Sequence, residues 1–233
     1  MRNLRILAAL GLIAATSAAQ ADVSGTAAIV SDYDFRGISQ TLNKATAQLS
    51  IDYASESGWY IGTWGSGVDF GAPKPSTEVD LYTGFRGSAG DLGYDAGINY
   101  YSYPGASDLN YPEIYAKPSY NIVSGGVYYS NHFGHKDNGS AVYVYGDVGI
   151  PAGPLVIGLH AGWSDGDGIA DTYGFGATEV QGPEKSYTDY SLGLSYSASN
   201  FTLGMKWVAI DAGRGGSDDR VILSISTSFP WEE

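Results

Sequence analysis

The fold is decided by one stretch, Ala45-Thr46-Ala47-Gln48-Leu49-Ser50-Ile51-Asp52-Tyr53, in which apolar and polar residues alternate without a break. Successive side chains of a β-strand point to opposite sides of the sheet. One side of this stretch is therefore Ala, Ala, Leu, Ile and Tyr, and the other side is Thr, Gln, Ser and Asp. The pattern predicts a β-strand with one apolar and one polar face.

The same period of two recurs along the chain from Asp22 onward, and no longer window shows the 3.6-residue spacing of a helix. A strand that crosses a bilayer at a tilt needs roughly 9 to 11 residues, which matches the usual length of these segments. Twelve segments carry the pattern: 23–35, 45–53, 59–70, 79–85, 92–100, 113–120, 122–131, 142–150, 155–163, 190–196, 201–207 and 221–229.

The connections between these segments alternate in length. Short turns fall near 55–58, 88–91, 121, 151–154 and 197–200, and longer polar loops fall near 36–44, 71–78, 102–112, 132–140, 164–186 and 211–219. Bacterial outer-membrane barrels have an even strand number, short periplasmic turns and longer outside loops. The sequence therefore predicts an all-β protein, a 12-stranded antiparallel up-and-down transmembrane β-barrel.

The composition limits the possible partners. The chain of 233 residues has 12 basic and 25 acidic residues, a net charge of −13, and no cysteine. Phosphate binding needs clustered Lys and Arg, so the acidic balance argues against nucleic acid as a partner. The lack of cysteine excludes disulfides, thiolate metal sites and cysteine nucleophiles. No cofactor is predicted.

The N-terminus has the pattern of a secretory signal peptide. Arg2 and Arg5 precede the apolar run 6–15, and Ala19-Gln20-Ala21 has the form of a cleavage site. We expect a signal peptide over 1–21, cleaved near Ala21, and a barrel over 22–233. No later stretch approaches the roughly 18 apolar residues of a membrane helix, so a membrane protein of this sequence must be a closed barrel. The predicted location is the outer membrane of a Gram-negative bacterium.

The polar faces of the predicted strands collect the charged residues. A charge that faces lipid costs about 2–4 kcal/mol at mid-membrane, so these side chains are predicted to face the lumen. The predicted lumen-lining residues are Asp32, Asp34, Arg36, Asp52, Asp80, Arg86, Asp95, Glu113, Lys117, Asp147, His160, Asp189, Lys206 and Arg220. Eight are acidic and five are Lys or Arg, so 5 − 8 = −3, which predicts a mild preference for cations if water fills the lumen. Alternatively, these groups pair across strands and plug the interior.

Aromatic residues lie near both ends of the predicted strands, as in the interfacial belts of membrane barrels. Those near the short turns are Tyr53, Trp59, Tyr60, Tyr120, Phe201 and Phe229, and those near the long loops are Tyr100, Tyr129, Trp163, Tyr190 and Trp207. The last strand ends in an aromatic residue, which resembles the C-terminal assembly signal of outer-membrane barrels. The tail Pro230–Glu233 departs from that signal, because the chain continues past the aromatic residue. Outer-membrane lipid and the barrel-assembly machinery are therefore the expected partners during biogenesis.

Several segments carry a family resemblance. They read SDYDFRGISQT (31–41), GTWGSGVDF (62–70), EVDLY (78–82), YSYPGA (101–106), YTDY (187–190) and DRVILSIS (219–226). Through these segments the chain resembles the TorF-like family of proteobacterial outer-membrane proteins, whose members are largely uncharacterised and are described as porins. The matches span nearly the whole mature chain in order. The resemblance implies an outer-membrane β-barrel with a pore function and supplies no catalytic or binding residue.

Two other chemistries have weaker signals. In the longest loop, Asp165, Asp167 and Asp171 alternate with glycine and form a weak Ca²⁺ candidate, without the distal Glu of an EF-hand. A hydrolase would use His160, which hairpin pairing places as a diagonal neighbour of Asp147, but no serine is placed to complete a triad. His132 and His135 lie in a polar loop, where histidines are ordinarily exposed to solvent and have no catalytic role. No metal and no enzyme activity is predicted.

The function favoured by these observations is an outer-membrane porin for passive diffusion of small hydrophilic solutes. Two alternatives stay open. One is a plugged structural or surface-receptor barrel, with loop 164–186 as its contact site. The other is an outer-membrane lipid hydrolase, since function cannot be deduced from fold alone.

Overall fold

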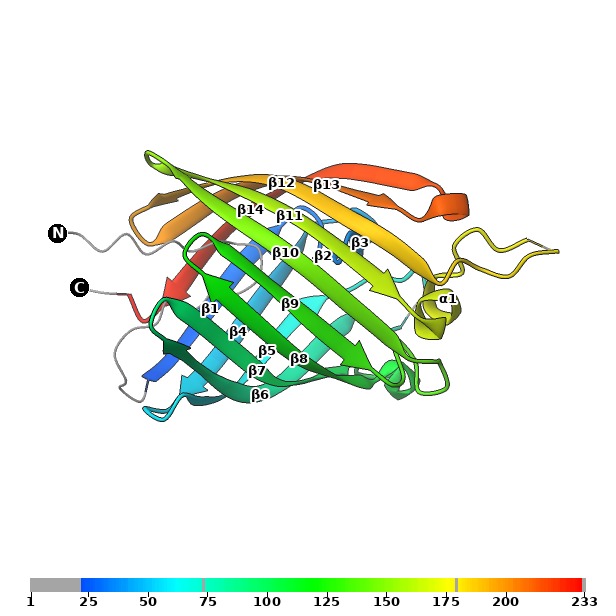
Figure 1. Cartoon of the computed structure of the whole chain (residues 1–233), viewed down its shortest axis with the longest axis horizontal. Coiled ribbons are helices and arrows are strands. Elements are labelled where there is room, and N and C mark those ends of the chain that lie inside the picture. Colours follow the sequence, from blue (N-terminus) through cyan, green and yellow to red (C-terminus); the bar gives the residue numbers. More distant parts are fainter. Residues whose placement is uncertain (1–21, 73, 179, 232–233) are drawn as a thin grey trace.

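The computed structural model describes residues 22–72, 74–178 and 180–231, in which twelve strands close into one antiparallel barrel (Figure 1). The predicted fold class is confirmed. The expected signal peptide with its cleavage near Ala21 lies outside the described residues. The twelve wall strands are β1 (Asp22–Val30), β4 (Thr46–Ala54), β5 (Trp59–Gly67), β6 (Thr77–Ala89), β7 (Leu92–Ser102), β8 (Tyr111–Tyr120), β9 (Val123–Ser130), β10 (Ala141–Ala152), β11 (Leu155–Asp165), β12 (Ser186–Ala198), β13 (Phe201–Asp211) and β14 (Ser217–Phe229).

Wall strands that follow one another along the chain pair with each other, and β14 pairs with β1 to close the barrel. Figure 1 shows the short turns, the start of β1 and the end of β14 at one end of the barrel and the long loops at the other. The predicted alternation of short and long connections is thus present in the fold. We call these the short-turn end and the long-loop end.

The first predicted strand is too long, because the wall strand β1 ends at Val30 and not at residue 35. The chain then turns into the barrel, where β2 (Asp34–Phe35) and β3 (Ile38–Ser39) form a small hairpin before β4 returns to the wall (Figure 1). We call residues 31–44 the inner segment. The prediction of a strand followed by an outside loop at 36–44 was wrong, because partners far away in sequence hold this segment inside.

Short helices lie at the long-loop end, although the sequence shows no helical period. They are η1 (Ser107–Leu109), α1 (Asp167–Tyr173) and η2 (Gly213–Gly215). A helix of two turns is too short to produce a clear 3.6-residue pattern. Among the described residues, no helix is long and apolar enough to cross a membrane.

The outer surface of the barrel is apolar along its middle. Leu81, Leu192 and Leu223 are examples, with about half of each side chain exposed. Nine of the eleven predicted belt residues are exposed by 40% or more, and Phe229 is partly buried; the nine are Tyr53, Trp59, Tyr100, Tyr120, Tyr129, Trp163, Tyr190, Phe201 and Trp207. The prediction that Tyr60 belongs to the outer aromatic belt was wrong, because its side chain is 5% exposed and faces the lumen. Tyr60 follows the outward-facing Trp59, and neighbouring residues of a strand point to opposite sides.

An apolar core fills the inside of the barrel at the long-loop end. We call it the mouth cluster, and it consists of Tyr101, Tyr103, Tyr111, Phe133, Ala141, Ile169, Tyr187, Ile210 and Ala212. These residues come from β7, β8, β10, β12, β13, α1 and the loops between them. Phe35 and Ile38 of the inner segment pack against it. The apolar core of this barrel therefore lies at the long-loop end, in contact with the inner segment.

Candidate functional site: the lumen of the barrel

The hairpin of the inner segment turns at Arg36 and Gly37, whose φ angles are 51° and 83°. Positive φ at both central residues suits the twist of a two-residue hairpin. Gly37 is also required by space, because a Cβ there would lie 2.3 Å from Ile210 Cγ2 and 2.7 Å from Asp189 Cβ. The tip of the hairpin is therefore pressed against the wall at β12 and β13.

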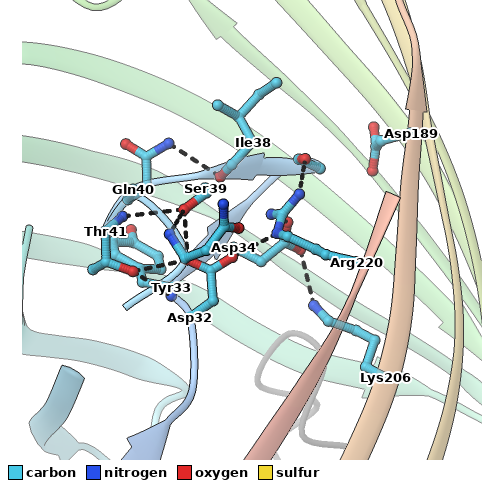
Figure 2. A network of polar contacts seen from close by, with 12 residues as sticks. Asp32, Tyr33, Asp34, Ile38, Ser39, Gln40, Thr41, Asp189, Lys206 and Arg220 are labelled. Atoms are coloured by element: carbon cyan, nitrogen blue, oxygen red, sulfur yellow. Dashed lines mark hydrogen bonds and ion pairs between the residues drawn. The ribbon is translucent and has the colours of Figure 1, made fainter. Parts of the chain in front are cut away.

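Two cations of the wall hold the first half of the inner segment (Figure 2). Arg220 on β14 donates to Asp32 and to Asp34, at 2.5 Å each, and to the carbonyl oxygen of Gly37 at 2.8 Å. Lys206 on β13 donates to the second oxygen of Asp34 at 2.9 Å. Each charge has an opposite charge within hydrogen-bond distance, which is the condition under which a buried ion pair is tolerated. This group of four charged residues is the latch.

The same Asp32 also organises the inner segment itself. Its Oδ1 accepts hydrogen bonds from the Ser39 and Thr41 hydroxyls at 2.5 and 2.8 Å, so the two arms of the segment are tied together (Figure 2). On the outer rim, Lys44 pairs with Asp69 at 2.7 Å, where both groups are solvated. A solvated pair adds little stability. The latch is therefore the stronger anchor.

A second ion pair holds the tip of the hairpin from the opposite wall. Arg36 donates to both carboxylate oxygens of Glu113 at 3.0 and 2.6 Å, and Tyr101 donates to the same carboxylate at 2.9 Å. The guanidinium lies 4.5 Å from the ring centroid of Tyr143 and 5.0 Å from that of Tyr128. Bidentate pairing and ring stacking both require the planar fork of arginine. The inner segment is therefore clamped between β14 and β13 on one side and β8 on the other.

The lumen widens on the other side of the inner segment, toward the short-turn end. Two cavities of about 530 and 360 Å³ lie there. The larger is lined by Asn121 and Ile122 of a short turn, and the smaller by Arg86 and Gly87 near another. Both share lining residues such as Phe35 of the inner segment, so they adjoin each other beneath it.

Tyrosine rings cover the wall of the smaller cavity, which we call the tyrosine wall. Four inward-facing tyrosines stand directly opposite glycines: Tyr60 opposite Gly84, Tyr82 opposite Gly62, Tyr115 opposite Gly97 and Tyr145 opposite Gly126. A Cβ on each glycine would lie 2.4 to 2.7 Å from a side-chain atom of its tyrosine. Each ring therefore lies across the neighbouring strand, with one face against the wall and the other toward the lumen.

Eleven of the fourteen predicted lumen residues lie on inward-facing positions of wall strands, and Asp32, Asp34 and Arg36 lie on the inner segment. Besides the latch and the Arg36–Glu113 pair, Lys117 pairs with Asp95 at 2.9 Å. Arg86 lies over the ring of Tyr60. Most of these charges are therefore paired inside the lumen, either with the inner segment or between neighbouring strands, and their part in conduction stays a prediction.

His160 lies between two carboxylates. Its Nδ1 is 2.7 Å from Asp147 and its Nε2 is 2.8 Å from Asp189, with the Tyr143 hydroxyl 2.9 Å from the same Nε2. Asp147 is directly opposite His160 in the hairpin, and not a diagonal neighbour as predicted. Ser191 is the cross-strand partner of His160 on the other side. Because carboxylates engage both ring nitrogens, this histidine is not free to activate a serine.

The acidic residues of the longest loop have separate partners. Asp167 pairs with Lys185 at 2.5 Å, and Asp171 accepts a hydrogen bond from the amide of Gly139 at 2.9 Å. Asp165 is the last residue of β11. Within the described part of the chain, no group of three or more His, Asp or Glu side chains is placed to hold a metal ion.

Glu78 is a lumen residue that the sequence pattern did not reveal; it is 1% exposed and accepts a hydrogen bond from the Tyr33 hydroxyl at 3.0 Å. It is two residues before Asp80 on β6, so both carboxylates face inward. Asp80 accepts a hydrogen bond from Asn99 at 3.1 Å, and the pattern did not reveal that asparagine either. The period of two would have revealed Glu78 if the predicted strand had begun at Thr77.

Solved porins share this architecture. The NanC porin superposes with a TM-score of 0.57 at 11% identity, over 90% of this chain and 100% of that one. A KdgM porin in complex with disordered oligogalacturonate gives a TM-score of 0.54 at 10% identity, over 89% and 99% of the two chains. Likeness at such low identity shows the fold alone.

A closed 12-stranded barrel with a charged, partly filled lumen defines a porin-type outer-membrane β-barrel fold. Within that class, the chain belongs to the Gcw_chp family, described as bacterial protein of unknown function, whose model matches residues 14–221. No curated protein sequence matches this chain.

Proposed function

We propose that the protein is an outer-membrane channel for small hydrophilic solutes, with a mild preference for cations, and that the inner segment controls its outer entrance. The lumen supports this proposal. Two adjoining cavities occupy the half near the short turns, whereas the inner segment and the mouth cluster fill the half near the long loops. A solute from outside passes only when the inner segment moves.

The charge of the cavities supports the preference for cations. Seven aspartates line them together with four Lys or Arg residues, so 4 − 7 = −3. Fixed charges in a narrow passage with low-dielectric walls set ion selectivity. The KdgM porin is described with oligogalacturonate, an anionic ligand. An anionic solute would meet the wrong charge in this lumen, so we expect a different solute here.

Biogenesis belongs to the same proposal. We propose that a signal peptide is cleaved near Ala21 and that the barrel-assembly machinery inserts the protein into outer-membrane lipid. The relation to the TorF-like porins is part of the same proposal. Trp231 of the tail donates to the Thr227 hydroxyl at 2.9 Å, so this part of the tail folds back on β14. Lipid hydrolysis is not proposed, because both nitrogens of His160 are engaged.

The test is single-channel recording of the refolded protein in planar bilayers under a tenfold KCl gradient. We expect discrete conductance steps with a reversal potential of the cation-selective sign. Arg220→Gln removes the charge that binds Asp32 and Asp34, so it should give larger or more frequent steps. Lys44→Gln is the matched control, because it removes one positive charge and one ion pair of the inner segment at the solvated rim. Its conductance should equal that of the wild type.

A plugged structural or receptor barrel is the second candidate, favoured by the buried mouth cluster. The same recordings separate the two functions. Silence from the wild type and from Arg220→Gln, each shown to be folded by heat-modifiable gel mobility, would overturn the channel and support the plug.

A further inference from the structure

The smaller cavity beneath the inner segment has an unusual lining. Ten of its twenty-three lining residues are aromatic, and four are aspartates. At about 360 Å³, the cavity lies within the usual range of small-molecule sites. Its position on the tyrosine wall gives it ring faces that point into the open space.

Protein cations already occupy two of these ring faces. Lys117 Nζ lies 4.4 Å from the ring centroid of Tyr115, and the Arg86 guanidinium lies 5.2 Å from that of Tyr60. A cation within about 6 Å of a ring face is attracted by the ring quadrupole. No side-chain cation of the described residues lies over Tyr82. Tyr145 also lacks a Lys or Arg, but its ring stacks on those of Tyr143 and His160 at centroid distances of 5.6 and 5.7 Å. Tyr82 is thus the ring of the tyrosine wall for which the described residues supply neither a cation nor a stacking partner.

The carboxylates beside Tyr82 also lack a cation. Asp52 accepts hydrogen bonds from the Tyr82 hydroxyl at 2.5 Å and from Ser50 at 3.1 Å, and Asp80 accepts one from Asn99. Within the described ranges, neither aspartate forms an ion pair. The hydrogen-bond donors that the described residues offer to these two carboxyl groups are thus all neutral.

Two buried polar side chains at this site have an unsatisfied acceptor. Asp80 Oδ1 and Asn99 Oδ1 have no hydrogen-bond partner among the described residues, and the two side chains are 7% and 8% exposed. Both line the cavity. Unsatisfied buried acceptors are rare in folded proteins and call for a missing donor. Acceptors, negative charge and a free aromatic face together match a positively charged ligand.

We propose that this cavity binds a small organic ammonium ion, held over the ring of Tyr82 between Asp52 and Asp80. The inference deepens the proposed function, because it names the class of solute. Carboxylates neutralise the ammonium charge while the tyrosine wall contacts its alkyl groups. A neutral sugar would also stack on the rings, but it leaves the two aspartates without a counter-ion.

The experiment measures binding and not conduction. Choline is titrated against the refolded full chain in lipid nanodiscs, with saturation transfer to its methyl protons as the readout. The uncharged isostere 3,3-dimethylbutan-1-ol controls for size and shape. We expect choline to bind at least tenfold more tightly than the isostere, because only choline carries the charge.

Three variants locate the site. Asp52→Asn and Asp80→Asn keep the size of each side chain and should each weaken choline binding at least tenfold. Glu56→Gln is the matched control, since it removes one exposed carboxylate in the short turn 55–58, outside the cavity. Its affinity should not change. Heat-modifiable gel mobility checks that every variant is folded.

Equal binding of choline and the isostere would overturn the proposal, as would choline binding that persists in both aspartate variants. Glucose binding that Asp52→Asn does not affect, without choline binding, would assign the cavity to a neutral sugar instead. Because choline binding is independent of conductance, a silent channel that binds choline overturns the proposed function and leaves the site intact.

Discussion

At the scale of the residue, the lumen depends on pairs in which a bulky side chain occupies the space that a glycine leaves. Tyr82 crosses β5 at Gly62 and reaches Asp52 on the strand beyond. Tyr60 crosses β6 at Gly84 in the same way and donates to Asp95 at 2.5 Å. Four such pairs build the tyrosine wall.

Replacement of Gly62 by alanine should destabilise the tyrosine wall. In Gly62→Ala the new Cβ would lie 2.4 Å from the Tyr82 ring and 2.6 Å from Asp52 Oδ1, so the ring must leave its position. We expect a loss of about 1–3 kcal/mol in the free energy of unfolding, the usual cost of overpacking. The measurement is urea unfolding of the protein in lipid vesicles.

Gly149→Ala is the control for this change. Gly149 also lies within a strand, but its new Cβ would meet only Val156 Cγ1 at 4.0 Å. Alanine reduces the freedom of the unfolded chain, so this variant should be neutral or slightly more stable. Equal destabilisation by both variants would contradict the proposed role of the tyrosine wall.

At the scale of the element, the inner segment differs from the loops at the long-loop end. Buried charges hold the inner segment, whereas the outer loops are joined to each other by exposed ion pairs. Lys136 pairs with Asp108 at 2.8 Å, and Arg214 pairs with Glu184 at 2.5 Å. Exposed pairs are weak and screened by salt. We therefore expect the loops to separate under mild conditions while the inner segment stays in place.

The element-scale prediction is a dependence on pH. The hydrogen bond and charge of Lys136 lower the pKa of Asp108. A carboxyl with a lowered pKa in the folded state contributes stability above its unfolded pKa of about 3.9, and this contribution is lost as the pH falls through the folded value. The two loops should therefore stay in contact at pH 6 and loosen below about pH 4.

Hydrogen exchange of the Lys136 amide reports this contact, because the amide donates to the Asp108 carbonyl oxygen at 2.8 Å. Protection, corrected for the intrinsic exchange rate at each pH, should fall as the pH decreases. In Lys136→Gln the pair is absent at every pH, so the decrease should disappear. An identical decrease in this variant would assign the effect to another group.

At the scale of the whole molecule, the barrel has an inside and an outside of opposite polarity. Its apolar outer surface suits lipid, while the charges meet inside. The corresponding prediction uses Leu192, at the middle of β12 and 49% exposed. Leu192→Arg should lower the free energy of unfolding in lipid vesicles by about 2–4 kcal/mol, because the guanidinium would face the centre of the bilayer.

Val180→Arg makes the same kind of change in the longest loop, at a side chain that is 93% exposed. It should leave the free energy of unfolding unchanged within about 0.5 kcal/mol, as is usual at the surface. A tolerated Leu192→Arg would mean that this face of the barrel does not meet lipid.

The number of strands, their antiparallel order and the apolar face of most of them could be predicted from the amino-acid sequence. These properties are local, since a period of two and the length of a turn can be counted along the chain. Eleven of the fourteen predicted lumen residues follow from the same count. The count of alternating residues gave the wrong side for Tyr60, because the predicted strand 59–70 was too irregular to separate an inward from an outward face.

The segment that fills part of the lumen could not be predicted from the sequence, because contacts between distant residues hold it there. Residues 31–35 continue the alternation of β1 in sequence, yet they leave the wall because Asp32 and Asp34 meet Arg220, almost two hundred residues later. Arg36 likewise meets Glu113 on the far wall. Closure of the barrel brings these charges together, and their burial requires that they pair. Because the partners are far apart in sequence, no local sequence pattern could predict this pairing.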